Sequence, residues 1–300
     1  MTSRYFLFGA GYSAKAFAAL ARRDGHHIAG TTRRAENFPA VQSGGIAPFV
    51  FDGSTAGGDL VEELKRTTHV LISIAPNGDD PVLAVAREVI ATSMPHLRWI
   101  GYYSTLSVYG DHEGRWISED AICNPVSRHA RQRLDAELAW QALGRELGIP
   151  VAIMRIAGIY GPGRNALANL ESGTARRIIK PGQVFNRIHV DDIAGATLLL
   201  AQGNLGGVYN FSDDLPAPAE DVVTFAADLM GVTPPPEIAF EDADLSPMGR
   251  SFYEETKRAA NDALKAEGYR FVYPDYRTAL QAMWADGTYR GGNRALLGSH

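Results

Sequence analysis

The residues with the clearest chemical meaning lie near the start of this sequence, where small residues recur at a spacing that suits phosphate binding. Positions 9–14 read Gly-Ala-Gly-Tyr-Ser-Ala, a GxGxxA pattern. In such a pattern Gly9 permits a tight turn, Gly11 lets the backbone approach a pyrophosphate, and Ala14 lets a helix sit close to a sheet. A glycine turn that serves packing alone is the alternative. The expected phosphate-binding residues are Gly9, Gly11, Tyr12, Ser13 and Ala14.

The pattern on either side of this turn is the one that a dinucleotide-binding turn requires. Residues 5–8 are apolar and predict a strand, and residues 14–23 carry apolar side chains at helical spacing. The turn therefore opens a helix. The N-terminus of that helix offers free N–H groups and the positive end of a dipole to the phosphates.

The end of the second predicted strand indicates which dinucleotide is bound. Proteins that bind NAD usually place an acidic residue there for the ribose 2′-hydroxyl, whereas an arginine accommodates the 2′-phosphate of NADP. Here Arg33 and Arg34 follow the strand, and no acid occurs before Glu36. Guanidinium groups can grip a phosphate bidentately, so we expect NADP(H) rather than NAD. Two solvated surface arginines are the alternative.

Two further stretches fall where the cofactor cleft would be lined. Asp52 follows the third predicted strand; it either accepts hydrogen bonds from the adenine or only caps the turn before Gly53. Ala75 and Pro76 follow the fourth predicted strand, where the backbone of a dinucleotide-binding domain lines the cleft.

The elements that must position these residues alternate along the first half of the chain. We expect strands at residues 5–8, 28–31, 48–51, 70–74, 98–103 and 151–156, and helices at 14–23, 82–91 and 128–147. Strands separated by helices need crossover connections, which give a parallel sheet covered on both faces. The predicted fold class is therefore α/β, a doubly wound parallel sheet of the Rossmann type.

The pattern loosens after Gly161, where we expect a small C-terminal α/β substrate lobe. A Thr-Pro-Pro-Pro spacer at 233–236 precedes two helices predicted near 251–267 and 275–284. The expected division is an NADP-binding Rossmann domain at 1–165, a substrate lobe at 166–286 whose segment 186–212 returns to the Rossmann core, and a loose tail at 287–300.

Composition narrows the class of protein. Of 300 residues, 45% are hydrophobic and 21% charged, which is ordinary for a globular protein. The net charge is -5 and no basic run occurs, which argues against nucleic acid as a partner. The single Cys123 suits a reducing cytoplasm. Residues 1–20 are apolar enough for a signal peptide, but Lys15 interrupts them, and no uncharged stretch reaches the ~18 residues that span a bilayer. We expect a cytoplasmic protein with no membrane partner.

Motifs further along resemble those of the extended short-chain dehydrogenases/reductases, the group that contains nucleotide-sugar epimerases and dehydratases. The overall appearance is most similar to the atypical subgroup of NAD(P)-dependent epimerases/dehydratases. Besides the glycine turn, the resemblance rests on the serine-rich segment 104–110, Glu119, Pro125, the arginine-to-arginine segment 155–164, the turn at 188–194 and the strand at 208–210. It implies a nicotinamide cofactor, and it places Ile156 among the residues that line the cofactor cleft.

The resemblance also implies where catalysis takes place. The family uses a Ser/Thr that orients the substrate oxygen, a tyrosine that is the general acid/base, and a lysine four residues later that holds the nicotinamide ribose. Thr105 matches the Ser/Thr. Counting from Pro125, however, His129 occupies the tyrosine position and Arg133 the lysine position. The spacing is intact, since 129, 133 and Glu137 share one helix face.

Two explanations fit this replacement. In the first, His129 exchanges the proton, because an unperturbed histidine pKa of ~6.5 suits proton transfer near neutrality, while Arg133 holds the ribose without giving up a proton. In the second, the catalytic site has decayed. Tyr102, Tyr103 or Tyr109 could supply the missing phenol, but packing in a strand and turn is the simpler role for all three.

The substrate side also departs from the family pattern. Gly158 stands where these enzymes commonly carry an asparagine that contacts the substrate diphosphate, and Phe185 stands where they carry an arginine. Arg187 is two residues on and shares the strand face, so it could substitute. Arg164 is a second candidate for binding substrate, and Arg250 a third. Ordinary surface charges are the alternative for all three.

We expect three polar residues near position 190 to have structural rather than catalytic roles. Asp191 and Asp192 precede a helix predicted at 193–202, and one of them is predicted to be its N-cap. His189 is expected to be structural. No spacing of His, Cys, Asp and Glu indicates a metal site.

The sequence therefore predicts an NADP(H)-dependent oxidoreductase or epimerase/dehydratase acting on a small polar substrate, either with or without a linked nucleotide. A non-catalytic NADP(H)-binding sensor or scaffold is the alternative, because it needs the same glycine turn and arginines. The protein is expected to be a monomer or homodimer. In the family the long helix at 128–147 often packs against a partner's copy, and here that surface would include Arg128, Arg131, Asp135 and Glu146.

Overall fold

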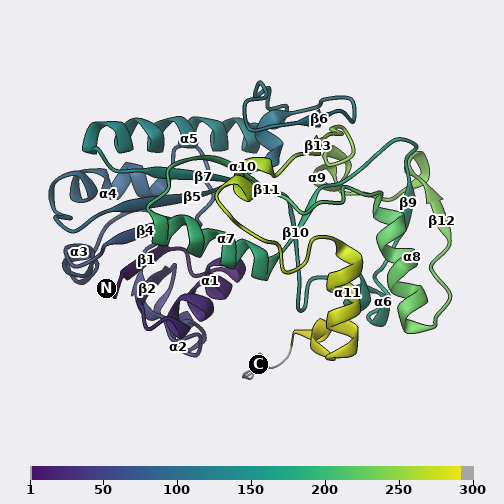
Figure 1. Ribbon diagram of the computed structural model, residues 1–300, viewed down its shortest axis with the longest axis horizontal. Coiled ribbons are helices and arrows are strands. Elements are labelled where there is room, and N and C mark those ends of the chain that lie inside the picture. The colour runs from purple at the N-terminus through teal and green to yellow at the C-terminus, as the bar shows by residue number, and fades with distance from the viewer. Residues whose placement is uncertain (1, 292–300) are drawn as a thin grey trace.

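A parallel sheet of seven strands forms the centre of the computed structural model, which describes residues 2–291 (Figure 1). In spatial order the strands are β11 (Gly207–Phe211), β7 (Val151–Ile156), β5 (Trp99–Thr105), β4 (His69–Ile72), β1 (Arg4–Phe8), β2 (His27–Thr32) and β3 (Ala47–Val50). Each neighbouring pair is parallel. The chain starts at β1, builds outward to β3, and then crosses to β4 on the other side of β1. This order is that of a doubly wound Rossmann sheet, so the predicted fold class is confirmed.

Helices cover both faces of the sheet. One face carries α1 (Tyr12–Arg23), α2 (Phe38–Gln42) and α7 (Val190–Gly203), and the other carries α3 (Gly58–Leu64), α4 (Pro81–Thr92) and α5 (Arg128–Leu147) (Figure 1). Each face has its own apolar core: Phe17 and Ile193 lie in one, Leu60 and Trp140 in the other. Because the strands are buried on both sides they are continuous apolar runs, which is the signal that located them in the sequence.

The long elements have nearly the bounds that the sequence predicts. α5 and β7 begin and end at the predicted residues, whereas β4 ends at Ile72 instead of residue 74. Asp80 fixes the start of α4, since its carboxylate accepts hydrogen bonds from the N–H groups of Val82 and Leu83. The same carboxylate accepts from the indole N–H of Trp140 at 3.1 Å, which ties α5 to α4.

The smaller lobe is built from short parallel strand pairs. These are β8 (Gly158–Tyr160) with β10 (Arg187–His189), β9 (Arg177–Ile179) with β12 (Glu237–Ala239), and β6 (Trp116–Ile117) with β13 (Arg258–Ala259). Three helices of the lobe, α6 (Ala166–Glu171), α8 (Ala219–Met230) and α11 (Tyr276–Ala285), lie together at the right of Figure 1. β10 leads into α7, and β11 joins the central sheet. The domain boundary at residue 165 stays a prediction.

The prediction of one helix over residues 251–267 is wrong. α9 (Pro247–Ser251) ends where that helix should begin, β13 is extended, and α10 occupies only Asp262–Ala266. The carboxylate of Asp111 accepts a hydrogen bond from the N–H of Thr256 at 2.7 Å, and the side-chain oxygen of Asn186 accepts from the N–H of Ala259 at 2.8 Å. These N–H groups are held by distant side chains and cannot bond within a helix, so the segment stays extended.

The prediction that Asp191 or Asp192 caps α7 is also wrong. His189 is the N-cap, and its ring nitrogen accepts a hydrogen bond from the N–H of Asp191. Asp192 is fully buried and accepts hydrogen bonds from the Tyr269 hydroxyl and the N–H groups of Val272 and Tyr273. Its carboxylate therefore holds residues 269–273 against the helix. His189 is buried, which agrees with its expected structural role.

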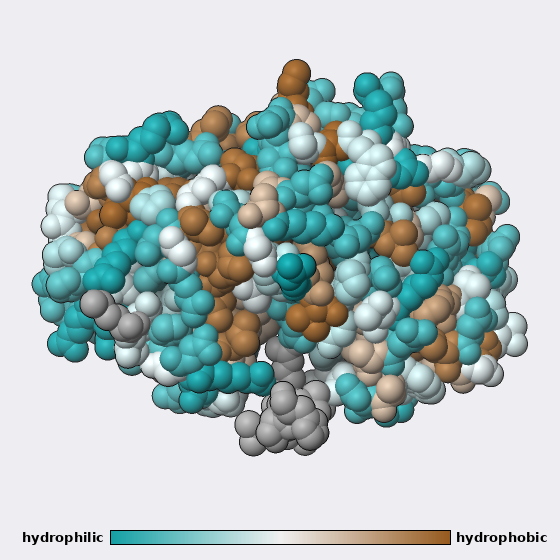
Figure 2. All heavy atoms as spheres, viewed as in Figure 1, coloured by the Kyte–Doolittle hydropathy of each residue, from teal (hydrophilic) through white to brown (hydrophobic). Residues whose placement is uncertain are grey.

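Part of the predicted C-terminal tail lies within the described residues. Residues 288–290 form a short 3-10 helix, η4 (Thr288–Arg290), in which Tyr289 is buried and Arg290 pairs with Glu171. The expectation of a loose tail is therefore wrong for residues 287–291, and residues 292–300 lie outside the described part. Within residues 2–291, no helix is both long and apolar enough to cross a membrane. Figure 2 shows a mainly hydrophilic face on which apolar patches are separated by polar residues.

Candidate cofactor and active site

The glycine turn lies between β1 and α1, as the GxGxxA pattern predicts. Gly9 has φ of +92°, a conformation that favours glycine, and a Cβ there would lie 2.9 Å from a side-chain carbon of Ile74. The buried Thr31 fixes the turn from β2, because its hydroxyl accepts a hydrogen bond from the N–H of Gly9 and its carbonyl from the N–H of Ala10. The turn is thus held in shape by β2.

The start of α1 fits the pyrophosphate of a dinucleotide. Gly11 is the N-cap, no side chain caps the helix, and its first turn contains no acidic residue. The positive end of the helix dipole therefore faces the space beside Gly11 without a side-chain cap. A Cβ built at Gly11 meets no atom within 4 Å, so the space beside it is open. Ser13 and Ala14 are buried against the sheet, as Ala14 must be for the close helix packing predicted.

Replacing Gly11 by alanine should separate cofactor binding from stability. Its φ of -83° is accessible to alanine and no atom crowds the new methyl group, so we expect the free energy of unfolding to change by less than about 1 kcal/mol. The methyl group would occupy the space for the pyrophosphate, and the rise in melting temperature on adding NADPH should be lost. Gly9→Ala is the contrasting variant, expected to lose stability as well, and an undiminished NADPH shift in Gly11→Ala would contradict the assignment.

Tyr12 connects the glycine turn to the segment after β8. Its hydroxyl donates a hydrogen bond to the carbonyl of Pro162 at 2.9 Å, and the guanidinium of Arg164 lies 4.5 Å from the centre of its ring. A Cβ at Gly161 would come within 2.8 Å of the Tyr12 hydroxyl, which explains a glycine there. Two motifs far apart in the sequence therefore meet at the predicted phosphate site.

Arg33 and Arg34 lie just beyond the end of β2, next to the 3-10 helix η1 (Ala35–Asn37), and both are exposed. No ion pair of either is found among the described residues. They lie beyond the carboxyl end of β2, and their role in holding a 2′-phosphate stays a prediction.

The other predicted cofactor residues lie along the same ends of the strands. The exposed Asp52 accepts hydrogen bonds from the N–H and the hydroxyl of Ser54, at 2.9 and 2.6 Å, which lower the pKa of its carboxyl. It therefore holds the turn after β3, and the adenine contact stays a prediction. Ala75 is exposed and Pro76 buried just after β4, and Ile156 is buried at the end of β7.

Thr105 is the last residue of β5, and Ile156 is its partner in β7. Its hydroxyl accepts a hydrogen bond from the N–H of Ser107 at 3.2 Å and starts the 3-10 helix η2 (Leu106–Tyr109). The side chain is half-buried, so the hydroxyl is held at the end of the strand and remains accessible to a ligand.

His129 and Arg133 are one turn apart on α5 but have different surroundings. His129 is exposed in the first turn of the helix, which Ser127 caps. Arg133 is half-buried, and its guanidinium donates hydrogen bonds to the carbonyl of Tyr103 and, at 3.4 Å, to the hydroxyl of Tyr102. Arg133 therefore contacts β5 two residues before Thr105, the last residue of that strand, whereas His129 is exposed one helical turn away.

The three tyrosines near this centre are packing residues in the structure. Tyr102, Tyr103 and Tyr109 are all buried. Burial raises the pKa of Tyr102 and of Tyr109 to about 12 and that of Tyr103 still further, which makes each phenol a poor proton donor to a base at neutral pH. Tyr109 donates to Asn210 at 2.8 Å, and Tyr103 bonds to Thr197. Their burial agrees with the expectation that all three tyrosines pack in a strand and turn.

A buried ion pair between β7 and α5 lies next to the end of β5. Arg155 of β7 and Glu137 of α5 lie 2.7 Å apart, with side chains 7% and 2% exposed. The carboxylate also accepts a hydrogen bond from the hydroxyl of Ser104, the residue before Thr105. The guanidinium lies 4.6 Å from the centre of the Tyr109 ring. This network fixes β5, β7 and α5 relative to one another beside the candidate centre.

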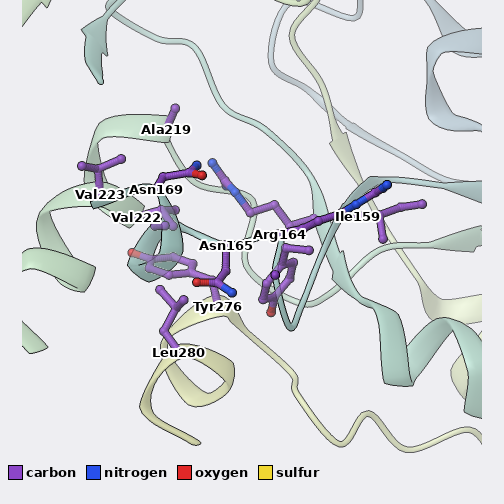
Figure 3. A pocket seen from close by; sticks show the side chains of 13 residues that line it. Ile159, Arg164, Asn165, Asn169, Ala219, Val222, Val223, Tyr276 and Leu280 are labelled. Atoms are coloured by element: carbon purple, nitrogen blue, oxygen red, sulfur yellow. The ribbon is translucent and has the colours of Figure 1, made fainter. Parts of the chain in front are cut away.

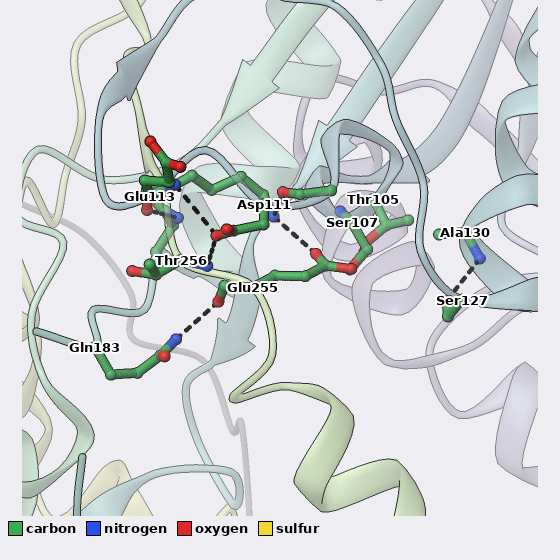
Figure 4. Close-up of polar contacts among 12 residues, drawn as sticks. Thr105, Ser107, Asp111, Glu113, Ser127, Ala130, Gln183, Glu255 and Thr256 are labelled. Carbon is green, nitrogen blue, oxygen red and sulfur yellow. Dashed lines mark hydrogen bonds and ion pairs between the residues drawn. The ribbon is translucent and has the colours of Figure 1, made fainter. Parts of the chain in front are cut away.

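A second ion pair reaches this centre from the smaller lobe, and no motif in the sequence predicts it. The ammonium of Lys257 lies 2.9 Å from the carboxylate of Glu255 and donates a hydrogen bond to the carbonyl of Gly110 at 2.7 Å. Figure 4 shows the Glu255 side chain directed toward Thr105 and Ser107. Both residues fall in the segment that was predicted to be helical, so only the tertiary structure brings them to the end of β5.

The two arginines predicted to bind substrate, Arg164 and Arg187, line one cavity of about 470 Å³ (Figure 3). The cavity lies between α6, α8 and α11 in the smaller lobe. Gly9, Gly11 and Thr105 do not line this cavity, but Arg164, which does, also stacks on Tyr12 of the glycine turn. Arg250, the third candidate, lies elsewhere and stacks on Phe240.

Comparison with known proteins agrees with these motifs. The profile of a family described as NAD dependent epimerase/dehydratase matches residues 7–211. Protein YeeZ of Escherichia coli (strain K12) is 27% identical over 281 residues, covering 90% of this chain and 96% of YeeZ.

Two solved structures have the same fold. A functionally unknown conserved protein from Silicibacter pomeroyi DSS is 42% identical, with a TM-score of 0.86, and the match covers 95% of this chain and 99% of that one. The human epimerase family protein SDR39U1, solved with NADPH, is 18% identical, with a TM-score of 0.70 over 94% of this chain and 99% of its own. At that identity the likeness concerns the fold alone.

Proposed function

This chain belongs to the NAD dependent epimerase/dehydratase family, and from that premise we propose that it is an NADP(H)-dependent oxidoreductase or epimerase/dehydratase. The observation that carries the proposal is made at the start of α1. No side chain caps this helix N-terminus, and a Cβ built at its N-cap, Gly11, meets no atom within 4 Å. Gly9, Gly11, Tyr12, Ser13 and Ala14 would hold the pyrophosphate. Because the human relative of this fold was solved with NADPH, the exposed Arg33 and Arg34 are proposed to hold a 2′-phosphate.

The proposed reaction centre is the end of β5. When bound, the cofactor supplies or accepts a hydride at the nicotinamide ring. The half-buried hydroxyl of Thr105 would orient the reacting oxygen of a small polar substrate, and Arg133 would hold the nicotinamide ribose with the donors that Tyr102 and Tyr103 do not use. His129, at the rim, would exchange the proton with solvent. Ala75, Pro76 and Ile156 would line the cleft, with Asp52 near the adenine. Arg164 and Arg187 would bind the substrate.

The second candidate is a non-catalytic NADP(H)-binding sensor or scaffold. The exposure of His129 favours it, because a proton-transfer residue usually lies in a cleft from which water is excluded. In the family the lysine lowers the pKa of the catalytic tyrosine. Here His129 stands in place of that tyrosine, so Arg133 has no phenol on which to act in this way. We propose a cytoplasmic location and a monomeric or homodimeric state for either function.

Replacing His129 by alanine distinguishes the two candidates once turnover has been found. NADPH oxidation would be followed with a panel of aldehydes, ketones and sugar nucleotides. If His129 exchanges the proton, kcat should fall by about 10²- to 10⁴-fold with a smaller change in KM. His96→Ala, an exposed histidine away from this helix, is the matched control. Unchanged turnover in His129→Ala would exclude the acid/base role, and tight NADPH binding without turnover of any compound would favour the sensor or scaffold.

A further inference from the structure

A protein that moves a hydride to or from a carbon–oxygen bond must also move a proton, and the residues that β5 and α5 bring to the candidate centre are poorly suited to take it. His129 is exposed to water, and Arg133 cannot give up a proton. The carboxylate of Glu137 is occupied by Arg155 and Ser104. The three tyrosines are buried, and burial raises the pKa of each. A better proton acceptor is therefore to be sought on another element.

The smaller lobe brings a carboxylate to this place. Figure 4 shows the side chain of Glu255 directed toward Thr105 and Ser107. Its Oε2 lies 2.9 Å from the ammonium of Lys257, whereas its Oε1 makes no hydrogen bond to any residue between 2 and 291. The side chain is 13% exposed, so it is shielded from bulk water without being sealed from it. One carboxylate oxygen is thus left to accept a hydrogen bond from a ligand.

Lys257 fixes the direction of this carboxylate. Its ammonium group is on a side chain only 8% exposed, and it bonds both to the carboxylate of Glu255 and to the carbonyl of Gly110. Gly110 directly follows η2, the 3-10 helix that the hydroxyl of Thr105 starts. The ammonium therefore ties the carboxylate of the smaller lobe to the same turn that holds the Thr105 hydroxyl, and the two side chains are kept in a fixed relation.

The backbone that carries Glu255 is also held in place. Its carbonyl accepts a hydrogen bond from the side-chain amide of Gln183 at 2.8 Å, and the N–H of Thr256 donates to the carboxylate of Asp111 at 2.7 Å (Figure 4). β13 follows closely in the chain and pairs with β6. Groups that are already ordered lose no free energy to reorganisation when a reaction takes place, which suits a role in catalysis.

We propose that Glu255 exchanges the proton with the reacting oxygen of the substrate, in the role that a tyrosine has elsewhere in the family. In the oxidation of a secondary alcohol, Oε1 takes the proton of the hydroxyl group. The hydrogen on the carbon leaves with its electron pair as a hydride to the oxidised nicotinamide, and a carbonyl group forms. In the reverse direction the carboxyl group returns the proton to the carbonyl oxygen. This role rests on the proposed function, with Thr105 holding the same oxygen, and it leaves to His129 only the exchange with solvent.

Replacing Glu255 by glutamine tests the proposal, because glutamine keeps the size of the side chain and still accepts from Lys257 but cannot take up a proton. Reduction of NADP⁺ by the full-length chain would be followed with a panel of secondary alcohols, polyols and sugar nucleotides. We expect kcat to fall by about 10²- to 10⁴-fold, while calorimetric titration finds the wild-type affinity for NADP⁺. Glu254→Gln removes the exposed carboxylate of the neighbouring residue, and it should match the wild type in both measurements.

Formate separates proton exchange from a purely structural role. Glu255→Ala should lose turnover as Glu255→Gln does, and sodium formate should restore it at least 10-fold, because a free carboxylate can enter the space of the missing side chain. Sodium chloride at the same concentration should restore nothing. Lost turnover that formate does not restore would make Glu255 a structural residue and overturn the proposal.

The NADP⁺ titration distinguishes failure of this role from failure of the proposed function. A wild type that does not bind NADP⁺ would refute both. A wild type that oxidises an alcohol no faster than Glu255→Gln does would refute the role of Glu255 alone. Binding of NADP⁺ without oxidation of any compound in the panel would also overturn the role and would favour the sensor or scaffold. Weaker binding of NADP⁺ to Glu255→Gln would assign the carboxylate to the cofactor instead of the proton.

Discussion

NADPH binding is expected to weaken about 100-fold when Arg33 and Arg34 are both replaced by methionine, while NADH binding stays unchanged. A hydrogen bond to a charged group contributes roughly 1.5–3 kcal/mol, and about 1.4 kcal/mol corresponds to a factor of ten in affinity. Two guanidinium groups on one 2′-phosphate therefore account for at least two factors of ten. NADH has no 2′-phosphate, so it should not sense the change.

The measurement is a pair of calorimetric titrations, with NADPH and with NADH, on the wild type and on the double variant. Arg23→Met, an exposed arginine at the other end of α1, is the control for a general loss of positive charge. Because exposed charges are screened, the difference between the two cofactors should also shrink as salt is raised. Equal affinity of the wild type for NADPH and NADH would refute the role of the two arginines.

The second large effect is expected at the buried ion pair between α5 and β7. Arg155→Met should lower the free energy of unfolding by about 3–5 kcal/mol, because it leaves the carboxylate of Glu137 buried without its counter-ion. The exposed pair of Arg87 and Glu146, with side chains 50% and 52% exposed, is the control, and Arg87→Met should cost less than about 1 kcal/mol. Chemical denaturation measures both.

A double variant shows whether the loss comes from the orphaned charge. Adding Glu137→Leu to Arg155→Met removes both charges, and most of the stability should return, since apolar side chains of similar size often replace a buried pair at little cost. The carboxylate also holds Ser104, so the double variant should still displace Thr105 and reduce any turnover. A single Arg155→Met variant as stable as the wild type would mean that water reaches Glu137 and that the pair is not structurally important.

The sequence predicts well those parts of the fold that are specified locally. α5 and β7 are found at the predicted residues because apolar spacing and burial on both sheet faces leave a clear pattern. The glycine turn is also specified locally, because Gly9 has a positive φ that favours glycine. Thr105 and Arg133 could be placed only through resemblance to a family.

What the sequence does not predict depends on contacts between distant residues. The strands β6 and β13 are two residues long, too short to leave a periodic pattern, and they exist because each pairs with the other. Lys257 and Glu255 reach the end of β5 only through that pairing. His189 is missed as a cap because Asp191 and Asp192 look like better ones, and their preference is overridden by the bonds of Asp192 to residues 269–273.

The pairing of β6 with β13 has a consequence for the order in which the molecule acquires its structure. Lys257 and Gly110 stand 147 positions apart, so this part of the candidate centre cannot form until nearly all of the chain has left the ribosome. The alternating strands and helices before residue 156 can assemble earlier, because all but one of their strand pairs, β1 with β4, join strands that follow one another along the sheet-forming part of the chain. Parallel pairing over such a separation is slow. In refolding, α/β secondary structure should therefore appear first, and the locking of Lys257 onto Gly110 should be among the last steps.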